Sequence, residues 1–176
     1  MKFLFPLGIM SLLLIISLNS FAQKDKSKRP SPPATVSQKI GEAVITINYS
    51  QPSVKGRTIG IDLEPIKGKV WRAGANEATV FETDKDLTVG GKFLPKGKYG
   101  FFILMQDETW ILIFNKTWDQ WGAFTYKETD DVLQVQALGS KAETFFEKLT
   151  YKINADGNMH ILWGDIDIHV MIQEKK

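Results

Sequence analysis

The chain has 176 residues, of which 22 are basic and 20 acidic, so its formal net charge at pH 7 is +2. This near balance gives no broad positive field, which argues against a nucleic-acid partner. The sequence contains no cysteine, which excludes disulfide bonds, thiolate metal sites, a cysteine nucleophile and the lipid anchor of a lipoprotein.

The first 22 residues have the pattern of a secretory signal peptide. Lys2 provides a positive start, residues 3–18 are almost entirely apolar, and the small residues Ser20 and Ala22 precede a cleavage point before Gln23. The apolar run is shorter than the roughly 20 residues that span a bilayer. We therefore expect an exported protein, periplasmic or extracellular, with no membrane span after cleavage.

Residues 23–33 read QKDKSKRPSPP and contain no apolar side chain apart from proline. Such a segment buries too little surface to offset the entropy of ordering it. We expect a flexible basic linker here, followed by a single domain at residues 34–174.

The remainder of the chain has the pattern of short β-strands. β-branched and aromatic residues alternate with period two, and glycine, proline and Asp-Gly separate the runs. One helix signal, a capping box at residues 140–143, interrupts them. About ten short strands with tight turns predict an all-β fold, an antiparallel β-sandwich of jelly-roll-like form. The predicted strands are 35–40, 43–49, 78–83, 86–90, 98–105, 109–115, 132–138, 146–154, 158–163 and 166–172.

Two turns predict the register of the last three strands. A three-residue loop at 155–157 pairs Tyr151 with Ile161, and a two-residue turn at 164–165 pairs Ile161 with Ile168. Both turns place the same apolar residues on one face. Because a slip of one residue would invert every side chain, this agreement specifies the register.

The opposite face of these strands, expected to be solvated, carries Leu162 and both histidines of the chain. The register places His160 opposite His169, with Asp167 on the same face, a combination that can ligate a metal ion. Lys152 lies opposite His160, and its positive charge disfavours a metal there. Exposed histidines are the simpler interpretation, so we expect neither a metal nor a cofactor.

The hairpin at residues 98–115 is apolar on both faces. Its register pairs Met105 with Trp110 and Phe102 with Ile113. A sheet with one solvated face would show polar residues on that face, so both faces of this hairpin must be covered. The second cover is a long loop, a partner subunit or a ligand.

Residues 49–77 form a loop of nearly 30 residues, longer than a compact domain usually contains without a function for it. Its guanidinium, amide, carboxylate and indole groups suit a sugar or a small carboxylate. In the alternative interpretation, Arg72 pairs with Glu77 as scaffold and the tryptophans belong to the core. The candidate ligand-binding residues are Arg57, Trp71, Arg72, Asn76 and Glu77, joined by Trp121 and Tyr126.

A family resemblance runs through the same residues. Over about residues 34–172 the chain resembles a family of secreted bacterial proteins catalogued as domain of unknown function 2911. The resemblance implies an exported β-rich domain without an established activity, and neither histidine is part of its pattern. The segments that carry it are YSQPSVKGR (49–57), KVWRAGANEAT (69–79), GGKFLPKGKYGFFIL (90–104), WILIFNK (110–116), WGAFTY (121–126) and DVLQV (131–135).

These features favour a non-catalytic binding module for a small polar, saccharide-like ligand, and we assign no catalytic residue. One alternative is a glycoside-type hydrolase in which Glu77 works with Asp62, Glu64 or Asp119. Such an enzyme needs two carboxylates about 5–5.5 or 6.5–9.5 Å apart across a cleft. Another alternative is a structural or partner-binding envelope protein that uses the apolar hairpin as its interface.

Overall fold

The computed structural model describes residues 25–176. The predicted signal peptide lies outside the described residues. None of the helices within residues 25–176 has the length and apolar character of a membrane span.

The predicted all-β antiparallel fold is confirmed, and its ten strands form one continuous sheet. The order in the sheet is β1-β2-β4-β7-β8-β9-β10-β5-β6, with β3 paired to β7 beside this path. The strands are β1 (Pro33–Ile40), β2 (Ala43–Ser50), β3 (Val70–Trp71), β4 (Thr79–Thr83), β5 (Leu87–Val89), β6 (Lys92–Leu94), β7 (Gly97–Gln106), β8 (Thr109–Asn115), β9 (Asp131–Ile153) and β10 (Asn158–Glu174), accompanied by the 3-10 turns η1 (Lys26–Lys28) and η2 (Glu128–Asp130).

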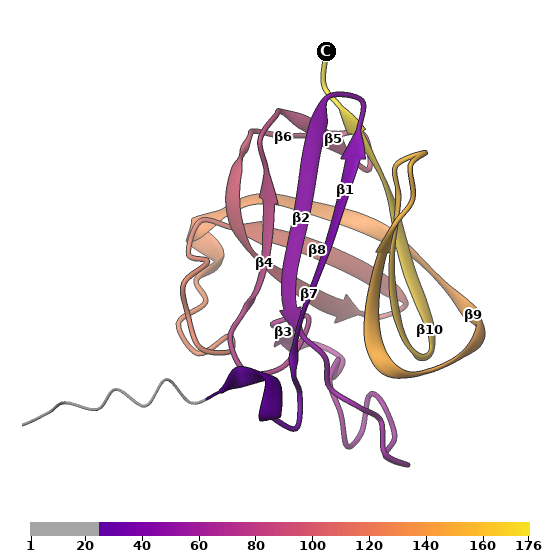
Figure 1. Ribbon diagram of the computed structural model, residues 1–176. Helices are drawn as coiled ribbons and strands as arrows, with labels where there is room; N and C mark the ends of the chain where they lie inside the picture. Colours follow the sequence, from indigo (N-terminus) through magenta and orange to yellow (C-terminus); the bar gives the residue numbers. More distant parts are fainter. Residues whose placement is uncertain (1–24) are drawn as a thin grey trace, which may run out of the picture.

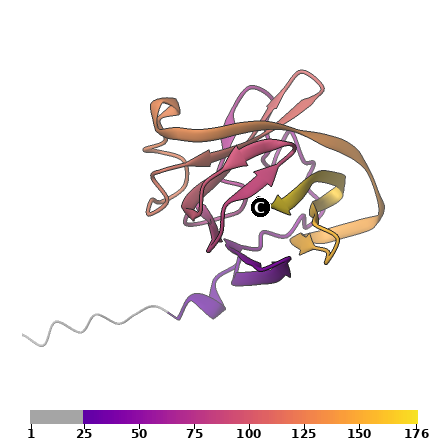
Figure 2. The ribbon, with the colours of Figure 1, turned by 90° about the horizontal axis from the view of Figure 1, so that it is seen from above.

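The sheet curls over its own apolar face, so the two layers expected of a sandwich are parts of one sheet. β1 and β2 lie on one side of the molecule, and the first half of β9 crosses the other side (Figures 1 and 2). The far end of β9 returns to the end of β2, where the Leu149 N–H donates to the Pro52 carbonyl and Gln51 Nε2 to the Leu149 carbonyl. The main core fills the enclosed space.

β9 and β10 are longer than the strands predicted from the sequence. The predicted strands 132–138 and 146–154 are both parts of β9, and the capping box at 140–143 lies within it as strand. The register between the end of β9 and the start of β10 is as predicted, with Tyr151 opposite Ile161.

β10 turns back on itself at Gly164, as the sequence predicts. Gly164 has φ +60°, which suits the first central position of a two-residue hairpin turn. The rings of His160 and His169, on the two halves of β10, have centroids 5.6 Å apart. The prediction that Leu162 lies on a solvated face is wrong, because Leu162 is buried. It lines a pocket on this face together with Phe146 of β9.

Both faces of the β7–β8 hairpin are covered by the chain itself. The predicted register is confirmed, with Phe102 opposite Ile113. These two residues face away from the main core and form a second apolar cluster with Ala78, against which Ala123 and Tyr126 pack. The segment after β8 therefore supplies the second cover.

The register predicts a clear contrast between two aspartate substitutions. Ile161→Asp should cost several kcal/mol, because Ile161 is fully buried in the main core and an unpaired carboxylate would replace it. Leu138→Asp in β9 makes a similar change at a side chain that is 69% exposed and should stay within about 1 kcal/mol of the parent. Urea unfolding of both variants tests this, and equal losses would contradict the register.

Candidate functional site

The turn between β3 and β4 carries three of the seven candidate residues, Arg72, Asn76 and Glu77, and Trp71 ends β3 directly before it. The Ala73 carbonyl accepts hydrogen bonds from Thr79 Oγ1 at 2.9 Å and from the Tyr151 hydroxyl at 2.7 Å. Trp71 Nε1 donates to the Gly74 carbonyl at 3.0 Å. A Cβ on Gly74 would lie 2.8 Å from Thr79 Oγ1, so only glycine fits there. These contacts fix residues 72–77 against the core.

Arg72 leaves this turn without a charged partner. Its Nε is buried and has no hydrogen-bond partner, and its guanidinium makes no ion pair among residues 25–176. Burial lowers the pKa of Arg72, and only the charge of the more distant Glu64 opposes this shift. The predicted Arg72–Glu77 pair is therefore wrong.

Arg72 and Glu64 line a small pocket of about 90 Å³. Trp71 and Trp163, which are both almost fully buried, also line it. Glu64 is held in place, because its Oε2 accepts from the Ile66 N–H at 2.8 Å and its carbonyl accepts from Trp163 Nε1 at 2.9 Å. The pocket is thus lined by a cation, an anion and two buried tryptophans.

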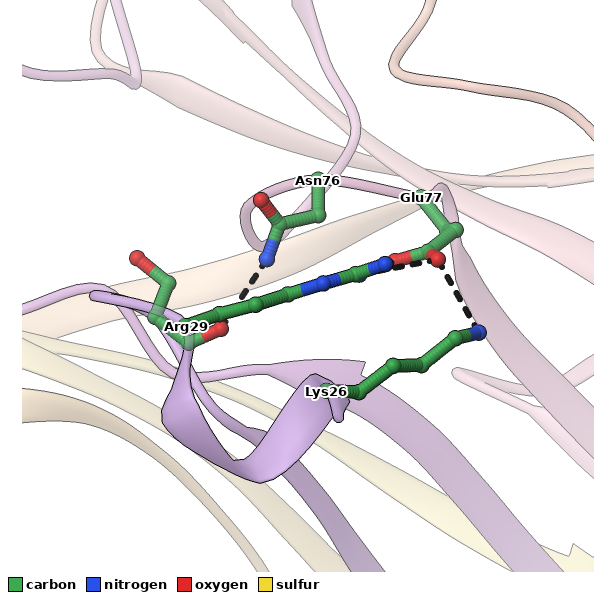
Figure 3. Close-up of polar contacts among 5 residues, drawn as sticks. Lys26, Arg29, Asn76 and Glu77 are labelled. Atoms are coloured by element: carbon green, nitrogen blue, oxygen red, sulfur yellow. Dashed lines mark hydrogen bonds and ion pairs between the residues drawn. The ribbon is translucent and has the colours of Figure 1, made fainter. Parts of the chain in front are cut away.

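Glu77 is instead neutralised by the segment that precedes β1. Arg29 Nη1 lies 2.9 Å from both carboxylate oxygens, and Lys26 Nζ lies 3.1 Å from Oε1 (Figure 3). Burial raises the pKa of Glu77, but the hydrogen bonds from Arg29 and Lys26 outweigh it and bring the pKa down to about 2. Asn76 Nδ2 adds a hydrogen bond to the Ser31 carbonyl at 2.9 Å. The predicted linker thus makes specific contacts with the domain.

Trp121 completes this second group. It pairs with Glu77 through an isolated β-bridge, and the Arg29 guanidinium lies 5.9 Å from its ring centroid. Its side chain is 54% exposed. The contact between Arg29 and the ring adds a cation–π attraction to the ion pair.

The other candidate residues lie apart. Arg57 donates from Nη2 to the Ser53 carbonyl at 2.7 Å and stabilises its own loop. The Tyr126 hydroxyl donates to Asp131 Oδ2 at 2.7 Å, and its ring packs 5.2 Å from that of Phe102. Both residues serve the scaffold in this structure.

Two members of these groups could not be predicted from the sequence. Arg29 lies 48 residues before Glu77, in a segment without a structural pattern. Trp163 lies far along the chain in β10, and no local signal connects it with Arg72. Both placements depend on how the curled sheet brings distant segments together.

Two of the four carboxylates considered for hydrolysis are bound by other groups. Glu77 is engaged by Arg29 and Lys26, and Asp62 Oδ2 accepts from the Thr58 N–H at 2.9 Å. A general acid needs a raised pKa, whereas the pKa of Glu77 is lowered. The one group of described residues with the donor set for a metal ion, His160, Asp167 and His169, lies on β10.

Comparison with known proteins gives a family and no function. The family model described as "Protein of unknown function (DUF2911)" matches residues 31–172. No curated protein and no solved structure matches the chain.

The ion pairs of Glu77 predict a pH-dependent attachment of the N-terminal segment. Because the pKa falls from its ordinary value of 4.5 to about 2 on folding, the stabilisation is present above pH 4.5 and is lost as the pH falls toward 2. Glu77→Gln should therefore cost about 1 kcal/mol or less at pH 7, since the side chain is 39% exposed and water screens the pair.

Urea unfolding at pH 7 and at pH 2, with trypsin cleavage at pH 7 after Lys26 or Lys28 as a second readout, tests this prediction. At pH 7 the variant should be cleaved faster than the parent, and at pH 2 the two should unfold alike. Glu108→Gln is the control, because Glu108 is exposed and makes no ion pair among the described residues. Equal cleavage of Glu77→Gln and Glu108→Gln at pH 7 would contradict the attachment.

Proposed function

Because the chain belongs to the DUF2911 family of proteins of unknown function, its function has to be inferred from its own site, and we propose that it is a binding module for a small polar ligand that carries a carboxylate. The ligand's carboxylate binds Arg72, and its hydroxyl or amino groups donate to Glu64. The protein is exported in this proposal, as the pattern of its first 22 residues predicts.

The observation that carries the proposal is the uncompensated charge of Arg72. A guanidinium remains protonated in proteins, and partial burial without a counter-ion or a partner for Nε costs free energy. Glu77, only five residues away, forms ion pairs with Lys26 and Arg29 instead of with Arg72. A carboxylate from solution would give Arg72 the planar, charge-assisted hydrogen bonds that it lacks.

The size and walls of the pocket define the class of ligand. A volume of about 90 Å³ is far below the roughly 300–1,000 Å³ of sites for drug-sized molecules, so it admits a head group or a single small metabolite. Trp71 and Trp163 also line the pocket and give it an apolar wall, which suits a ligand with an apolar portion. A small hydroxy acid meets these conditions, as does a sugar acid of which only the carboxylate end enters the pocket.

Arg72→Met should leave the ligand-free protein as stable as the parent or make it more stable, because the substitution removes a half-buried charge without breaking an ion pair. Thermal unfolding without added ligand measures this. A large loss of stability would mean that Arg72 is scaffold, which would contradict the proposal.

Matched ligand pairs test the binding itself. Thermal shift assays should show that glucuronate, gluconate or lactate raises the melting temperature, whereas glucose and glycerol, which lack the carboxylate, have little effect. Arg72→Gln should abolish the shift. Arg57→Gln, which removes an arginine outside the pocket, should retain it. The proposal fails if no carboxylate in such a panel stabilises the protein, or if Arg72→Gln responds as the parent does.

A further inference from the structure

The hairpin formed by β10 gathers the only two histidines of the chain around one carboxylate. His160 lies before the turn at Gly164, and Asp167 and His169 lie after it. All three side chains are partly buried. This cluster is separate from the pocket of Arg72, and it uses different residues.

The donor atoms are close to the arrangement that one metal ion requires. His160 Nδ1 lies 3.0 Å from Asp167 Oδ1, and His169 Nδ1 lies 3.9 Å from the same oxygen. One ligand atom from each residue falls within 4.8 Å of the other two. With metal–ligand distances of about 2.0–2.2 Å, donors around a tetrahedral zinc ion lie about 3.3–3.6 Å apart, so side-chain adjustments of about 1 Å suffice.

His169 carries the second observation that points to a ligand. Its Nδ1 is buried and has no hydrogen-bond partner within the part of the chain that the structure describes, although it faces the carboxylate of Asp167. A buried polar atom without a partner is unfavourable, and a metal ion between Nδ1 and the carboxylate would satisfy it. The ion would also replace the proton that His160 Nδ1 donates to Asp167.

The surroundings leave room for the ion and its remaining ligands. His160 and Asp167 line a pocket of about 290 Å³. Lys152, whose charge disfavours a metal, also lines this pocket, and its ammonium group lies 5.3 Å from the ring centroid of Phe146. Glu143 lines the same pocket and adds a negative charge to it.

We propose that His160, Asp167 and His169 bind one divalent transition-metal ion of the zinc class. Imidazole nitrogen and carboxylate oxygen are ordinary zinc ligands, and two histidines with one carboxylate leave a coordination position open. Water or a small anion entering from the pocket completes the coordination. The site does not depend on the function proposed for Arg72.

Zinc titration of untagged, chelator-treated protein tests the site, with a chromogenic chelator as competitor and Co²⁺ absorption as a report of ligand geometry. The chain has no cysteine and no third histidine that could substitute for the site. We expect one Zn²⁺ per chain and a loss of affinity of at least about ten-fold in His169→Ala and Asp167→Asn. Asp165→Asn is the matched control, because it removes an exposed carboxylate from the turn of the same hairpin and should bind as the parent does.

Wild-type protein provides a readout that does not depend on the folding of a variant. Substoichiometric Cu²⁺ should broaden the imidazole NMR resonances of both histidines together. Circular dichroism identifies a variant that fails to fold, and His169→Gln then replaces His169→Ala. The proposal is overturned if zinc does not bind at one equivalent, if His169→Ala or its replacement binds as tightly as Asp165→Asn, or if only one histidine broadens.

Discussion

The buried hydrogen bonds to the Ala73 carbonyl determine what the rest of the site can do. Tyr151 reaches this carbonyl from β9 and Thr79 from β4, so the turn at residues 72–77 is fixed to both sides of the curled sheet. An unpaired buried carbonyl would cost about 1–3 kcal/mol, and Ala73 also has a positive φ of 54° that the surrounding contacts must maintain. Arg72 therefore cannot relax easily toward a distant carboxylate, and its position relative to the pocket is set by the fold.

Two opposite charges in this one turn have contrasting surroundings. Glu77 receives Arg29 and Lys26 from the segment before β1, although one cation would neutralise it. Arg72 forms no ion pair with a carboxylate within residues 25–176, and Glu64 lines the same pocket without contacting it. If the turn served the scaffold alone, pairing Arg72 with Glu77 would satisfy both charges locally. Because Glu77 pairs elsewhere, the cation of Arg72 and the carboxylate of Glu64 line one small cavity. A ligand with an acidic group for Arg72 and a hydrogen-bond donor for Glu64 would match this arrangement.

Local patterns predicted most of the fold. Alternation of period two located the long strands, and the turns at 155–157 and 164–165 gave the pairing of Tyr151 with Ile161 and the approach of His160 to His169. β3 and β6 have only two and three residues, too few for a periodic signal. The burial of Leu162 could not be predicted, because the alternation within one hairpin does not show which other segment packs against its outer face.

The candidate site was less predictable, because its contacts join segments that are distant in the sequence. The loop and most of its polar residues could be identified from length and composition. The partner of Glu77 could not, since Arg29 lies in a segment whose composition resembles a linker. The pocket beside Arg72 also needs Trp163 from β10, and a sequence pattern records no relation between the two.

The central claim, that Arg72 is held ready for an anionic group, can be tested at the atom concerned. The chain has three arginines, so the Nε–H signals in a ¹H–¹⁵N spectrum can be assigned by substituting each one. During a titration with glucuronate, the account predicts that the Nε–H signal of Arg72 shifts and exchanges more slowly with water, while those of Arg29 and Arg57 change little. An Arg72 signal that stays unchanged at saturating glucuronate, gluconate and lactate would contradict the account.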